Sequence, residues 1–460
     1  MLFRKMMNEL TSWKENEKCA LLIEGARQVG KTKLIEEFIK DFNNSIEIDF
    51  TKNTNALSLL LETKSYDDFI NRLSLISPIS LKDSNDILFL DEIKYYYEMR
   101  EKRIVDDPLF AEKHIDIITL TKEIVNRGDF RIILSGSMLG VSVFNINLNP
   151  TGYLRKVTMY PMDFEEFLLA KGIKQELIGD LRQSFINKEA IDDTLNETLL
   201  KCYSEYLFVG GFPAAVQGYI DDESFNATSN ALESIDNWYR GDILKYAPKE
   251  DRLVISEMYD ILPSEISMKN KKFVKSHLVD IPDYRNLDLK DRFLWLKKAG
   301  IALPIYNVTN PKYPLKISED YKVVKLFIND VGLLTHFIFD NEAKRKLLVD
   351  KGDVDLGAIY ENAAAELLTA HGYNPFFHST KKRGEIDFIL EKNMTVIPIE
   401  IKSYAPDKKT GYFSHQALNL LLESHKEIKE SWIFGLNNIK KEGDNIYMFP
   451  AYMIEFVRKN

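Results

Sequence analysis

The chain has 460 residues, a length for which two to four domains are expected. Its formal net charge is -9 and its pI is near 5.5, and its apolar and charged fractions are those of a soluble globular protein. Cys19 and Cys202 are lone and far apart, which excludes a disulfide framework and a cysteine metal cluster, and the acidic balance argues against general coating of nucleic acid. Because no window has the roughly 18 consecutive apolar residues of a membrane helix and residues 1–8 lack a secretory core, a cytoplasmic protein without a membrane partner is expected.

Up to about residue 175, short apolar strands alternate with helical stretches, and this alternation predicts a parallel α/β sheet. Strands are expected at residues 20–23, 45–50, 87–90, 131–135 and 157–160. After the last of these, Asp163 and Glu166 have the spacing of a capping box, which predicts a helix that runs through Ala170.

The first expected strand is followed by the pattern G-x-x-x-x-G-K-T and then by an amphipathic helix, the context that a phosphate-binding loop requires. The pattern consists of Gly25, Ala26, Arg27, Gln28, Val29, Gly30, Lys31 and Thr32. Its glycines let successive main-chain N–H groups point at phosphate oxygens. Lys31 would reach the β and γ phosphates, and the Thr32 hydroxyl would bind magnesium. The pattern therefore predicts ATP and Mg²⁺ as cofactors, with a chance match in a glycine turn as the alternative.

Residues 87–90 form a second apolar strand, which ends in Asp91 and Glu92. The acids fall at the carboxyl edge of the sheet, where α/β folds bind their ligands. Asp91 is predicted to hold magnesium, and Glu92 to orient and deprotonate the attacking water. Ser135 ends a strand expected between these two and is a candidate sensor of the γ-phosphate. The alternatives are a strand ending in two solvated acids and an ordinary Ser/Gly turn.

Three arginines are candidates for pairing with phosphate charge, in the same subunit or in a neighbour: Arg27, Arg155 and Arg240. The alternative for each, which the sequence favours, is an ordinary surface or salt-bridge arginine. The sequence therefore leaves the arginine finger undefined, and a homo-oligomer remains an open expectation.

The remainder of the chain divides by pattern into three further segments. Residues 176–250 are helical and are interrupted by the turn at 210–213; residues 251–320 read as helices followed by a short strand pair. From about 321 an α/β pattern returns, with strands at 386–390 and 396–401 joined by a hairpin turn at Lys392 and Asn393. The predicted domains are therefore 1–175, 176–250, 251–320 and 321–460.

Asp387 lies in one of these C-terminal strands and Glu400 in the next, with Lys402 two residues further. Since side chains alternate along a strand, Glu400 and Lys402 project from one face, where Asp387 can meet them. Two carboxylates and a lysine suit metal-assisted phosphodiester cleavage. An ordinary surface ion pair is the alternative. Three histidines of this region receive no ligand role, because a lone histidine is more often structural: His371, His378 and His415.

The chain resembles a large prokaryotic group of AAA-type ATPases that carry a C-terminal domain of unknown function with a restriction-endonuclease-like, PD-(D/E)XK, fold. The matching segments are residues 25–32, 89–93, 134–137, 160–167, 210–213, 325–334, 359–362, 384–388 and 398–402. The chain departs from the group at Lys94, where Gln is common, at Tyr153, often a basic residue, and in the longer, more charged stretch 95–130.

This resemblance implies a P-loop ATPase core, a helical lid, a winged-helix segment and a nuclease-like end. It places Gly211 and Pro213 near the adenine, and it makes Glu361 a further acid and Gln416 a weaker candidate of the C-terminal pocket. The expected function is magnesium-dependent ATP hydrolysis by a protein that acts on or with DNA or RNA. The alternative is an ATP-dependent switch or scaffold whose nuclease-like domain binds a partner without cutting. A small-molecule kinase is a weaker third reading, because nothing after Glu92 suggests an acceptor pocket.

Overall fold

The computed structural model describes residues 2–137, 152–222, 224–268, 271–278, 281, 288–350, 352, 354–382 and 384–459. The chain forms two compact units. The N-terminal unit comprises Arg4–Tyr160 and Lys298–Gly300, and the C-terminal unit comprises Met1–Phe3, Pro161–Lys297 and Ile301–Asn460. Within the described ranges, no helix combines the length and the apolar character needed to cross a bilayer.

A five-stranded sheet with the order β2-β3-β4-β1-β5 forms the centre of the N-terminal unit. All four neighbouring pairs are parallel. The strands are β1 (Ala20–Gly25), β2 (Asn44–Asp49), β3 (Asp86–Asp91), β4 (Arg131–Ser137) and β5 (Leu154–Met159). The predicted parallel sheet is confirmed, and β4 lies between β1 and β3 as expected. The carboxyl ends of these strands therefore meet at one edge of the sheet.

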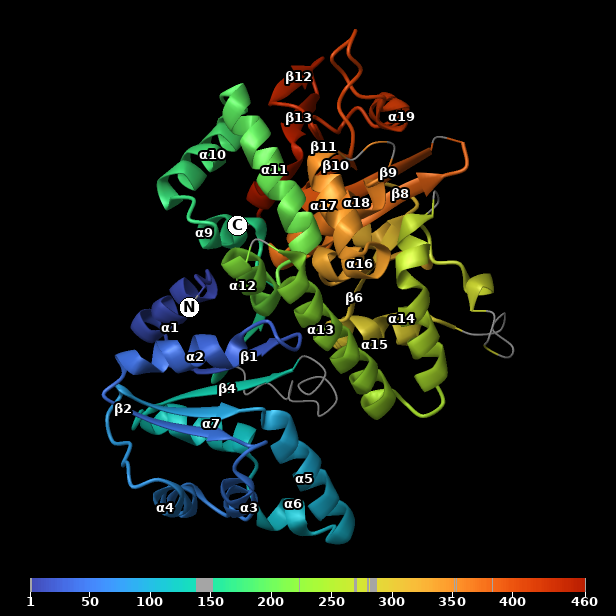
Figure 1. Ribbon diagram of the computed structural model, residues 1–460. Helices are drawn as coiled ribbons and strands as arrows, with labels where there is room; N and C mark the ends of the chain where they lie inside the picture. The colour runs from blue at the N-terminus through green and yellow to red at the C-terminus, as the bar shows by residue number, and fades with distance from the viewer. Residues whose placement is uncertain are drawn as a thin grey trace. The chain divides into compact units, whose positions relative to one another are not determined.

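Helices cover both faces of this sheet, as Figure 1 shows: α1 and α2 lie on one side, and α3, α4 and α7 on the other. The second face carries a large apolar core in which alternate strand residues such as Leu22, Leu88 and Leu134 pack with helix residues such as Phe69 and Ile124. The helices are α1 (Met6–Asn16), α2 (Lys31–Phe38), η1 (Ile39–Asp41), α3 (Thr54–Leu61), α4 (Tyr66–Ile76), α5 (Ile93–Asp106), α6 (Phe110–Lys113) and α7 (Ile117–Arg127).

The C-terminal unit begins with a run of helices. The first of them opens with the predicted capping box: Asp163 accepts from the Glu166 N–H at 3.0 Å, and the Glu166 side chain accepts from the Asp163 N–H at 3.3 Å. The helices are α9 (Phe164–Ala170), α10 (Gln175–Asn187), α11 (Asp193–Val209), α12 (Pro213–Asp222), α13 (Phe225–Tyr246), α14 (Arg252–Ser267), η2 (Lys275–His277) and α15 (Lys290–Lys298).

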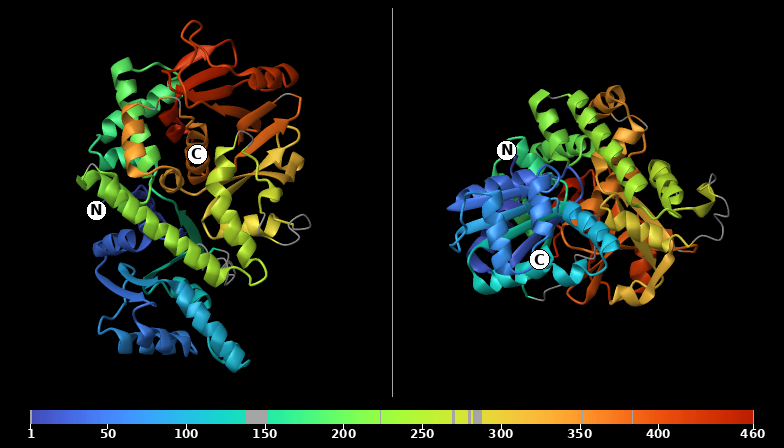
Figure 2. Two further views of the ribbon diagram at one scale, coloured as in Figure 1. Left: turned by 45° about the vertical axis from the view of Figure 1, so that its right-hand side comes forward. Right: turned by 90° about the horizontal axis from the view of Figure 1, so that it is seen from below.

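An eight-stranded mixed sheet follows, with the order β12-β13-β11-β10-β9-β8-β6-β7 (Figures 1 and 2). Its strands are β6 (Ala302–Val308), β7 (Glu319–Ile328), β8 (Phe376–Thr380), β9 (Gly384–Lys392), β10 (Thr395–Ile401), β11 (Ser431–Gly435), β12 (Lys440–Glu442) and β13 (Ile446–Pro450). The remaining elements are η4 (Leu315–Ser318), α16 (Val331–Ile338), α17 (Asn341–Val349), α18 (Gly357–Ala370), α19 (Gln416–Ser424) and η5 (Ala451–Phe456).

The β6–β7 hairpin follows α15, where the sequence predicts a short strand pair and the resemblance implies a winged helix. It also belongs to the large sheet, because β6 pairs in parallel with β8 through Asn307 and Phe377. The predicted boundary at residue 320 falls within β7. The division into four domains and the winged helix stay predictions, and residues 269–270, 279–280 and 282–287 of that segment lie outside the described residues.

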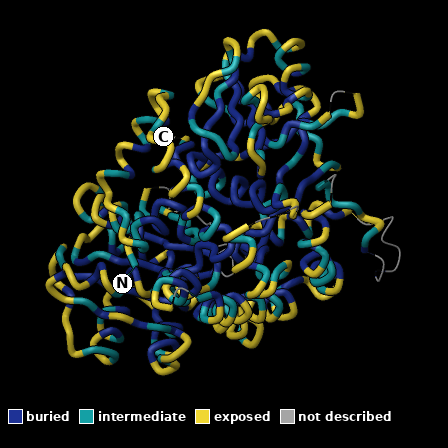
Figure 3. The backbone as a smooth tube through the Cα atoms, turned by 45° about the horizontal axis from the view of Figure 1, so that its top comes forward, coloured by how far each residue is buried: buried dark blue, intermediate teal, exposed yellow. Residues whose placement is uncertain are grey.

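Helix α18 is deeply buried, since every residue from Ile359 to Leu368 is buried. Figure 3 colours the backbone by burial, with buried segments in dark blue and exposed segments in yellow. The helix contacts β7 and β10 of the sheet and also η5. It therefore brings Glu361 toward the sheet and places its own C-terminal end beside η5.

Candidate functional site

The loop between β1 and α2 has the backbone that the phosphate-binding pattern predicts. Gln28 and Gly30 both have positive φ angles, 66° and 94°. At Gly25 a side chain is excluded for another reason: an added Cβ would overlap the main-chain carbonyl of Met159 on the adjacent strand β5. The glycine spacing of the motif thus reflects one tight strand contact and one left-handed turn that leads into the helix.

Lys31 is buried and folds back over the loop. Its Nζ donates to the carbonyl oxygens of Gly25 at 3.0 Å and of Ala26 at 2.9 Å. Burial lowers the pKa of Lys31 to about 8, partly opposed by the carboxylates of Glu92 and Asp91. The ammonium group is therefore held inside the loop that would receive phosphate, with its preference for the charged state reduced.

Asp91 is the meeting point of three elements at the carboxyl edge of the sheet. The Thr32 hydroxyl of α2 donates to Asp91 Oδ2 at 2.7 Å, and the Ser135 hydroxyl of β4 donates to Asp91 Oδ1. A threonine hydroxyl beside a carboxylate offers the hard oxygen ligands that Mg²⁺ prefers. The structure thus brings together the two residues that the sequence assigns to magnesium.

Glu92 follows directly and begins α5 from an unusual backbone conformation. Its φ of 52° lies in the left-handed region, which costs a non-glycine residue on the order of 1–3 kcal/mol. Burial raises the pKa of Glu92; Lys31 lowers it and Asp91 raises it. A carboxylate with a raised pKa beside the phosphate loop is suited to accept a proton from water.

Arg4 supports the loop and is a residue that the sequence reasoning missed. Its buried guanidinium donates to the carbonyl oxygens of Val29 at 2.5 Å and of Tyr160 at 2.7 Å. It therefore ties the phosphate-binding loop to the end of the segment after β5. No local pattern in the sequence marks it, because the contact to Tyr160 spans most of the unit.

The three candidate arginines have different partners in the structure. Arg155 forms ion pairs with Glu9 and Glu17. Arg240 pairs with Asp236 at 2.9 Å and with Asp260. Both therefore have the salt-bridge role that was the alternative reading. Arg27 belongs to the phosphate-binding loop itself and contributes to the electrostatic environment of Lys31 and Glu92.

Gly211 and Pro213 lie in the C-terminal unit, where the Gly-Gly turn is closely packed. The Gly211 N–H donates to Asp330 Oδ2 at 2.7 Å, and its carbonyl accepts from the Met162 N–H at 2.6 Å. A Cβ on Gly211 would overlap the Met162 backbone. This packing explains the glycine without a nucleotide, so contact of Gly211 and Pro213 with adenine stays a prediction.

Replacing Gly211 by alanine is expected to lower the free energy of unfolding of the C-terminal unit by about 1–3 kcal/mol or more, because the new methyl group meets main-chain atoms that cannot move aside. Chemical unfolding followed by fluorescence would measure it. Gly241→Ala is the matched control, since a Cβ at helical Gly241 meets no atom within 4 Å. Equal stability of the two variants would contradict the packing role.

In the C-terminal sheet, Asp387 and Glu400 stand on the adjacent antiparallel strands β9 and β10, as expected. Asp387 Oδ2 accepts from the Ile401 N–H at 2.8 Å, and the Lys402 ammonium lies 2.6 Å from Glu400 Oε2. The predicted hairpin turn is present one residue later than expected, at Asn393 and Met394, which both have positive φ. Gln416 is exposed at the start of α19.

Lys325 of β7 enters this cluster, which the sequence reasoning did not foresee. Its Nζ lies 2.6 Å from Glu385, 3.3 Å from Glu361 and 3.9 Å from Asp387, and its side chain is 1% exposed. Lys271 forms a second ion pair with Glu361. Among the described residues, Glu361, Asp387 and Glu400 do not place one oxygen each within 4.8 Å of one another.

The charges of the cluster follow from this arrangement. Burial raises the pKa of Asp387 to about 7, reinforced by Glu361 and opposed by Lys325. For Glu361, burial also acts to raise the pKa, but Lys325 and Lys271 outweigh it and the pKa is lowered. Lys325 itself has a raised pKa despite burial, because carboxylates surround it. The cluster is thus neutralised by lysine side chains of the chain itself.

Three family models match the chain in succession. Residues 17–168 match the AAA domain, residues 200–344 match a domain of unknown function, DUF8612, and residues 356–452 match another, DUF4143. The chain therefore carries an AAA-type P-loop ATPase domain, followed by two domains to which the matching models assign no function. The first match contains the phosphate-binding loop, Asp91, Glu92 and Ser135.

A relative over most of the chain is an uncharacterized protein of Haemophilus influenzae, 23% identical over 413 residues, which are 87% of this chain and 85% of the relative. Among solved structures, the Walker-type ATPase PABY2304 of Pyrococcus abyssi is 16% identical with a TM-score of 0.40, covering 74% of this chain and 96% of its own. AMPPCP-bound DnaA from Aquifex aeolicus is 15% identical with a TM-score of 0.30, covering 64% and 78%.

Proposed function

We propose that this protein binds ATP and hydrolyses it to ADP and phosphate in a magnesium-dependent reaction at the carboxyl edge of the five-stranded sheet. The observation that carries the proposal is the convergence of Thr32, Ser135 and the phosphate-binding loop on Asp91. Thr32 and Asp91 would hold Mg²⁺, which when bound neutralises charge on the β and γ phosphates.

Each side chain of the site has a distinct part in this reaction. Lys31 exchanges its bonds to the carbonyls of Gly25 and Ala26 for the β and γ phosphates, which keeps its ammonium paired as nucleotide enters. Glu92 orients the attacking water and takes its proton. Ser135, on the strand between the two motifs, would contact the γ-phosphate. The main-chain N–H groups of residues 25–32 bind phosphate oxygens.

Replacing Lys31 by alanine tests the binding site directly. Loss of a charged phosphate ligand is expected to abolish detectable ATP association in calorimetry and to lower phosphate release on the order of 10²-fold or more. Lys33→Ala is the matched control, two residues further in the same helix, where the side chain is 81% exposed and pairs with Glu36. Equal ATP affinity of the two variants would refute the proposal.

Nucleotide binding is expected to take up a proton near pH 8. Because the pKa of Lys31 is about 8 in the free protein, about half of the molecules carry a neutral amine there, and a bound triphosphate favours the ammonium. Uptake should fade toward pH 6, where Lys31 is already charged. Calorimetry in buffers of different ionisation enthalpy measures it. Lys31→Arg, whose guanidinium stays charged, should show no such uptake, and equal uptake would contradict the assignment.

We infer that the C-terminal domain binds a partner and does not cut nucleic acid. In this reading the protein is a switch, and ATP binding determines whether it is assembled with that partner. The observation favouring this reading is Lys325, a buried ammonium among the carboxylates Glu361, Glu385 and Asp387 where metal-assisted cleavage would need a divalent ion. The restriction-endonuclease-like fold, the winged helix and a DNA or RNA partner remain predictions of the resemblance.

Incubation with ATP, Mg²⁺ or Mn²⁺ and single- or double-stranded DNA or RNA tests this inference. The expected result is ATP turnover without cleavage of any strand. Cleavage that is lost in both Asp387→Asn and Glu400→Gln would replace the inference by the nuclease function. Light scattering with and without ATP separately reports whether nucleotide changes the assembly of the chain.

A further inference from the structure

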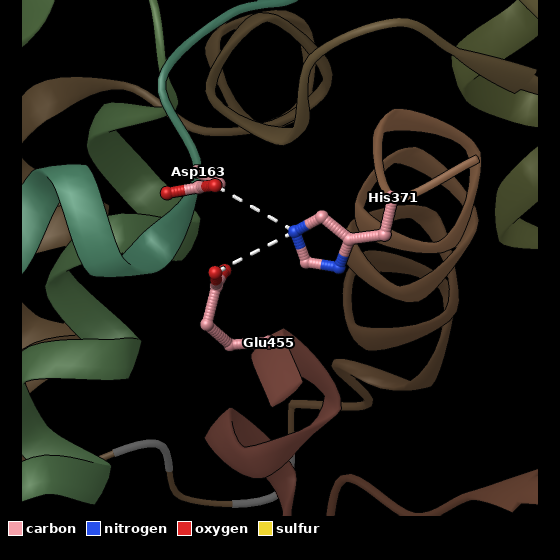
Figure 4. A group of neighbouring side chains, drawn as sticks. All are labelled: Asp163, His371 and Glu455. Atoms are coloured by element: carbon pink, nitrogen blue, oxygen red, sulfur yellow. Dashed lines mark ion pairs between the residues drawn. The ribbon is translucent and has the colours of Figure 1, made fainter. Parts of the chain in front are cut away.

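Three side chains from distant parts of the sequence meet inside the C-terminal unit, away from the C-terminal carboxylate cluster. Asp163 precedes α9, His371 follows α18, and Glu455 belongs to η5. Figure 4 shows the imidazole Nε2 of His371 pointing between the two carboxylates. It lies 3.6 Å from Asp163 Oδ2 and 3.5 Å from Glu455 Oε1.

Each of the three side chains is held by the protein backbone through its other polar atom. Asp163 Oδ1 accepts from the Glu166 N–H at 3.0 Å, and Glu455 Oε2 accepts from the Phe164 N–H at 3.1 Å. His371 Nδ1 lies 3.2 Å from the Val457 carbonyl oxygen. A hydrogen bond from Nδ1–H to a carbonyl selects the tautomer with a lone pair on Nε2, the usual outer support of a metal-bound histidine.

The distances distinguish coordination from direct hydrogen bonding. Nε2 lies beyond the ~2.7–3.2 Å of an N–H···O bond from both carboxylates. Two ligand atoms at ~2.0–2.2 Å from a tetrahedral ion are separated by roughly 3.3–3.6 Å, which agrees with the two spacings. His371 Nε2 has no hydrogen-bond partner although its side chain is only 5% exposed. The buried Nε2 of His371 thus faces a point at which one metal ion could bind this nitrogen and an oxygen of each carboxylate.

Charge at this point favours a cation. The carboxylates of Asp163 and Glu455 both lie within 3.6 Å of His371 Nε2. Arg458 is the competing cation, with Nη2 at 2.8 Å from Glu455 Oε1, 3.0 Å from Glu165 Oε2 and 3.9 Å from Asp163 Oδ2. A metal ion would therefore share Glu455 with Arg458, which also pairs with Glu165.

We propose that Asp163, His371 and Glu455 bind one divalent transition-metal ion of the zinc class, which joins the start of α9 to the ends of α18 and η5. One imidazole with two carboxylates suits Zn²⁺ better than Mg²⁺, which prefers oxygen ligands alone. Three protein ligands leave a fourth position for water. The site is independent of the proposed ATP reaction and has a structural role.

Equilibrium dialysis of the full-length, metal-free protein against Zn²⁺ tests the proposal. One bound ion is expected, while Mg²⁺ at the same concentration does not displace it. His371→Gln should weaken Zn²⁺ binding by more than the roughly 10–100-fold that loss of an outer-sphere partner costs. His415→Gln is the matched control: His415 is also buried, with Nδ1 on the Phe413 carbonyl, but its Nε2 faces one carboxylate, Glu442.

Asp163→Asn provides a second variant, because asparagine caps a helix as well as aspartate does and so preserves α9. It too should lose Zn²⁺. Cobalt substitution adds a direct readout, since a visible absorption band of tetrahedral Co²⁺ should appear in the wild type and in His415→Gln but not in His371→Gln. Absence of Zn²⁺ binding by the wild type, or binding by folded His371→Gln or Asp163→Asn as tight as by His415→Gln, would overturn the proposal.

Discussion

Replacing Glu92 by glutamine is expected to lower the turnover number for ATP about 10²–10⁴-fold while ATP still binds. The amide keeps the size of the side chain and the positive-φ start of α5 but cannot take a proton from water. Because Lys31, Thr32 and Asp91 are unchanged, affinity for ATP should be equal or higher, since one negative charge beside the phosphates is removed. Single-turnover phosphate release together with calorimetry separates the two effects.

The control for this variant is Glu101→Gln, which makes the same chemical change at an exposed position of the same helix, α5. It should turn over ATP at the wild-type rate. If Glu92→Gln did so as well, Glu92 would not be the proton acceptor, whereas loss of ATP binding in Glu92→Gln would assign it to binding rather than to catalysis.

Replacing Lys325 by methionine is expected to destabilise the C-terminal unit by about 3–5 kcal/mol, the usual cost of removing one partner from a buried ion pair. Methionine retains much of the length and apolar stem of lysine but leaves Glu361, Glu385 and Asp387 without their shared ammonium. Hydrogen exchange of the β9 and β10 amides measures the effect locally. Lys346→Met, at an exposed i,i+4 pair with Glu342, should leave the stability of the unit close to that of the wild type, because solvent screens such a pair.

The same variant tests whether Lys325 takes the place of a metal ion. Adding Mn²⁺ should protect β9 and β10 in Lys325→Met and should leave the wild type unchanged, because the ammonium already occupies the centre of the carboxylates. Mn²⁺ protection of the wild type to the same extent would show that lysine and metal coexist, and the non-cutting assignment would then be withdrawn.

Much of the nucleotide site could be predicted from the sequence because its parts are contiguous. The glycine spacing sets the loop backbone, and apolar runs that end in Asp91 or Ser135 place those residues at one edge of a parallel sheet. The C-terminal hairpin followed from the same reasoning, since strand alternation places Glu400 beside Lys402. The predicted sets of site residues were incomplete. They lacked Arg4 and Lys325, because neither residue has a local sequence pattern that links it to its site.

By itself, the sequence determined the strands of the five-stranded sheet, the place of β4 between β1 and β3, and the identity of the residues that converge on Asp91. Only the tertiary structure decided which charges meet: Lys325 reaches the carboxylates because β7 joins the same sheet, and Asp163, His371 and Glu455 meet because three helix ends come together. The physical reason is the distance along the sequence over which each kind of interaction acts. Backbone geometry and strand alternation act over a few residues and can be read along the chain, whereas a buried charge is set by neighbours that packing brings from anywhere in it.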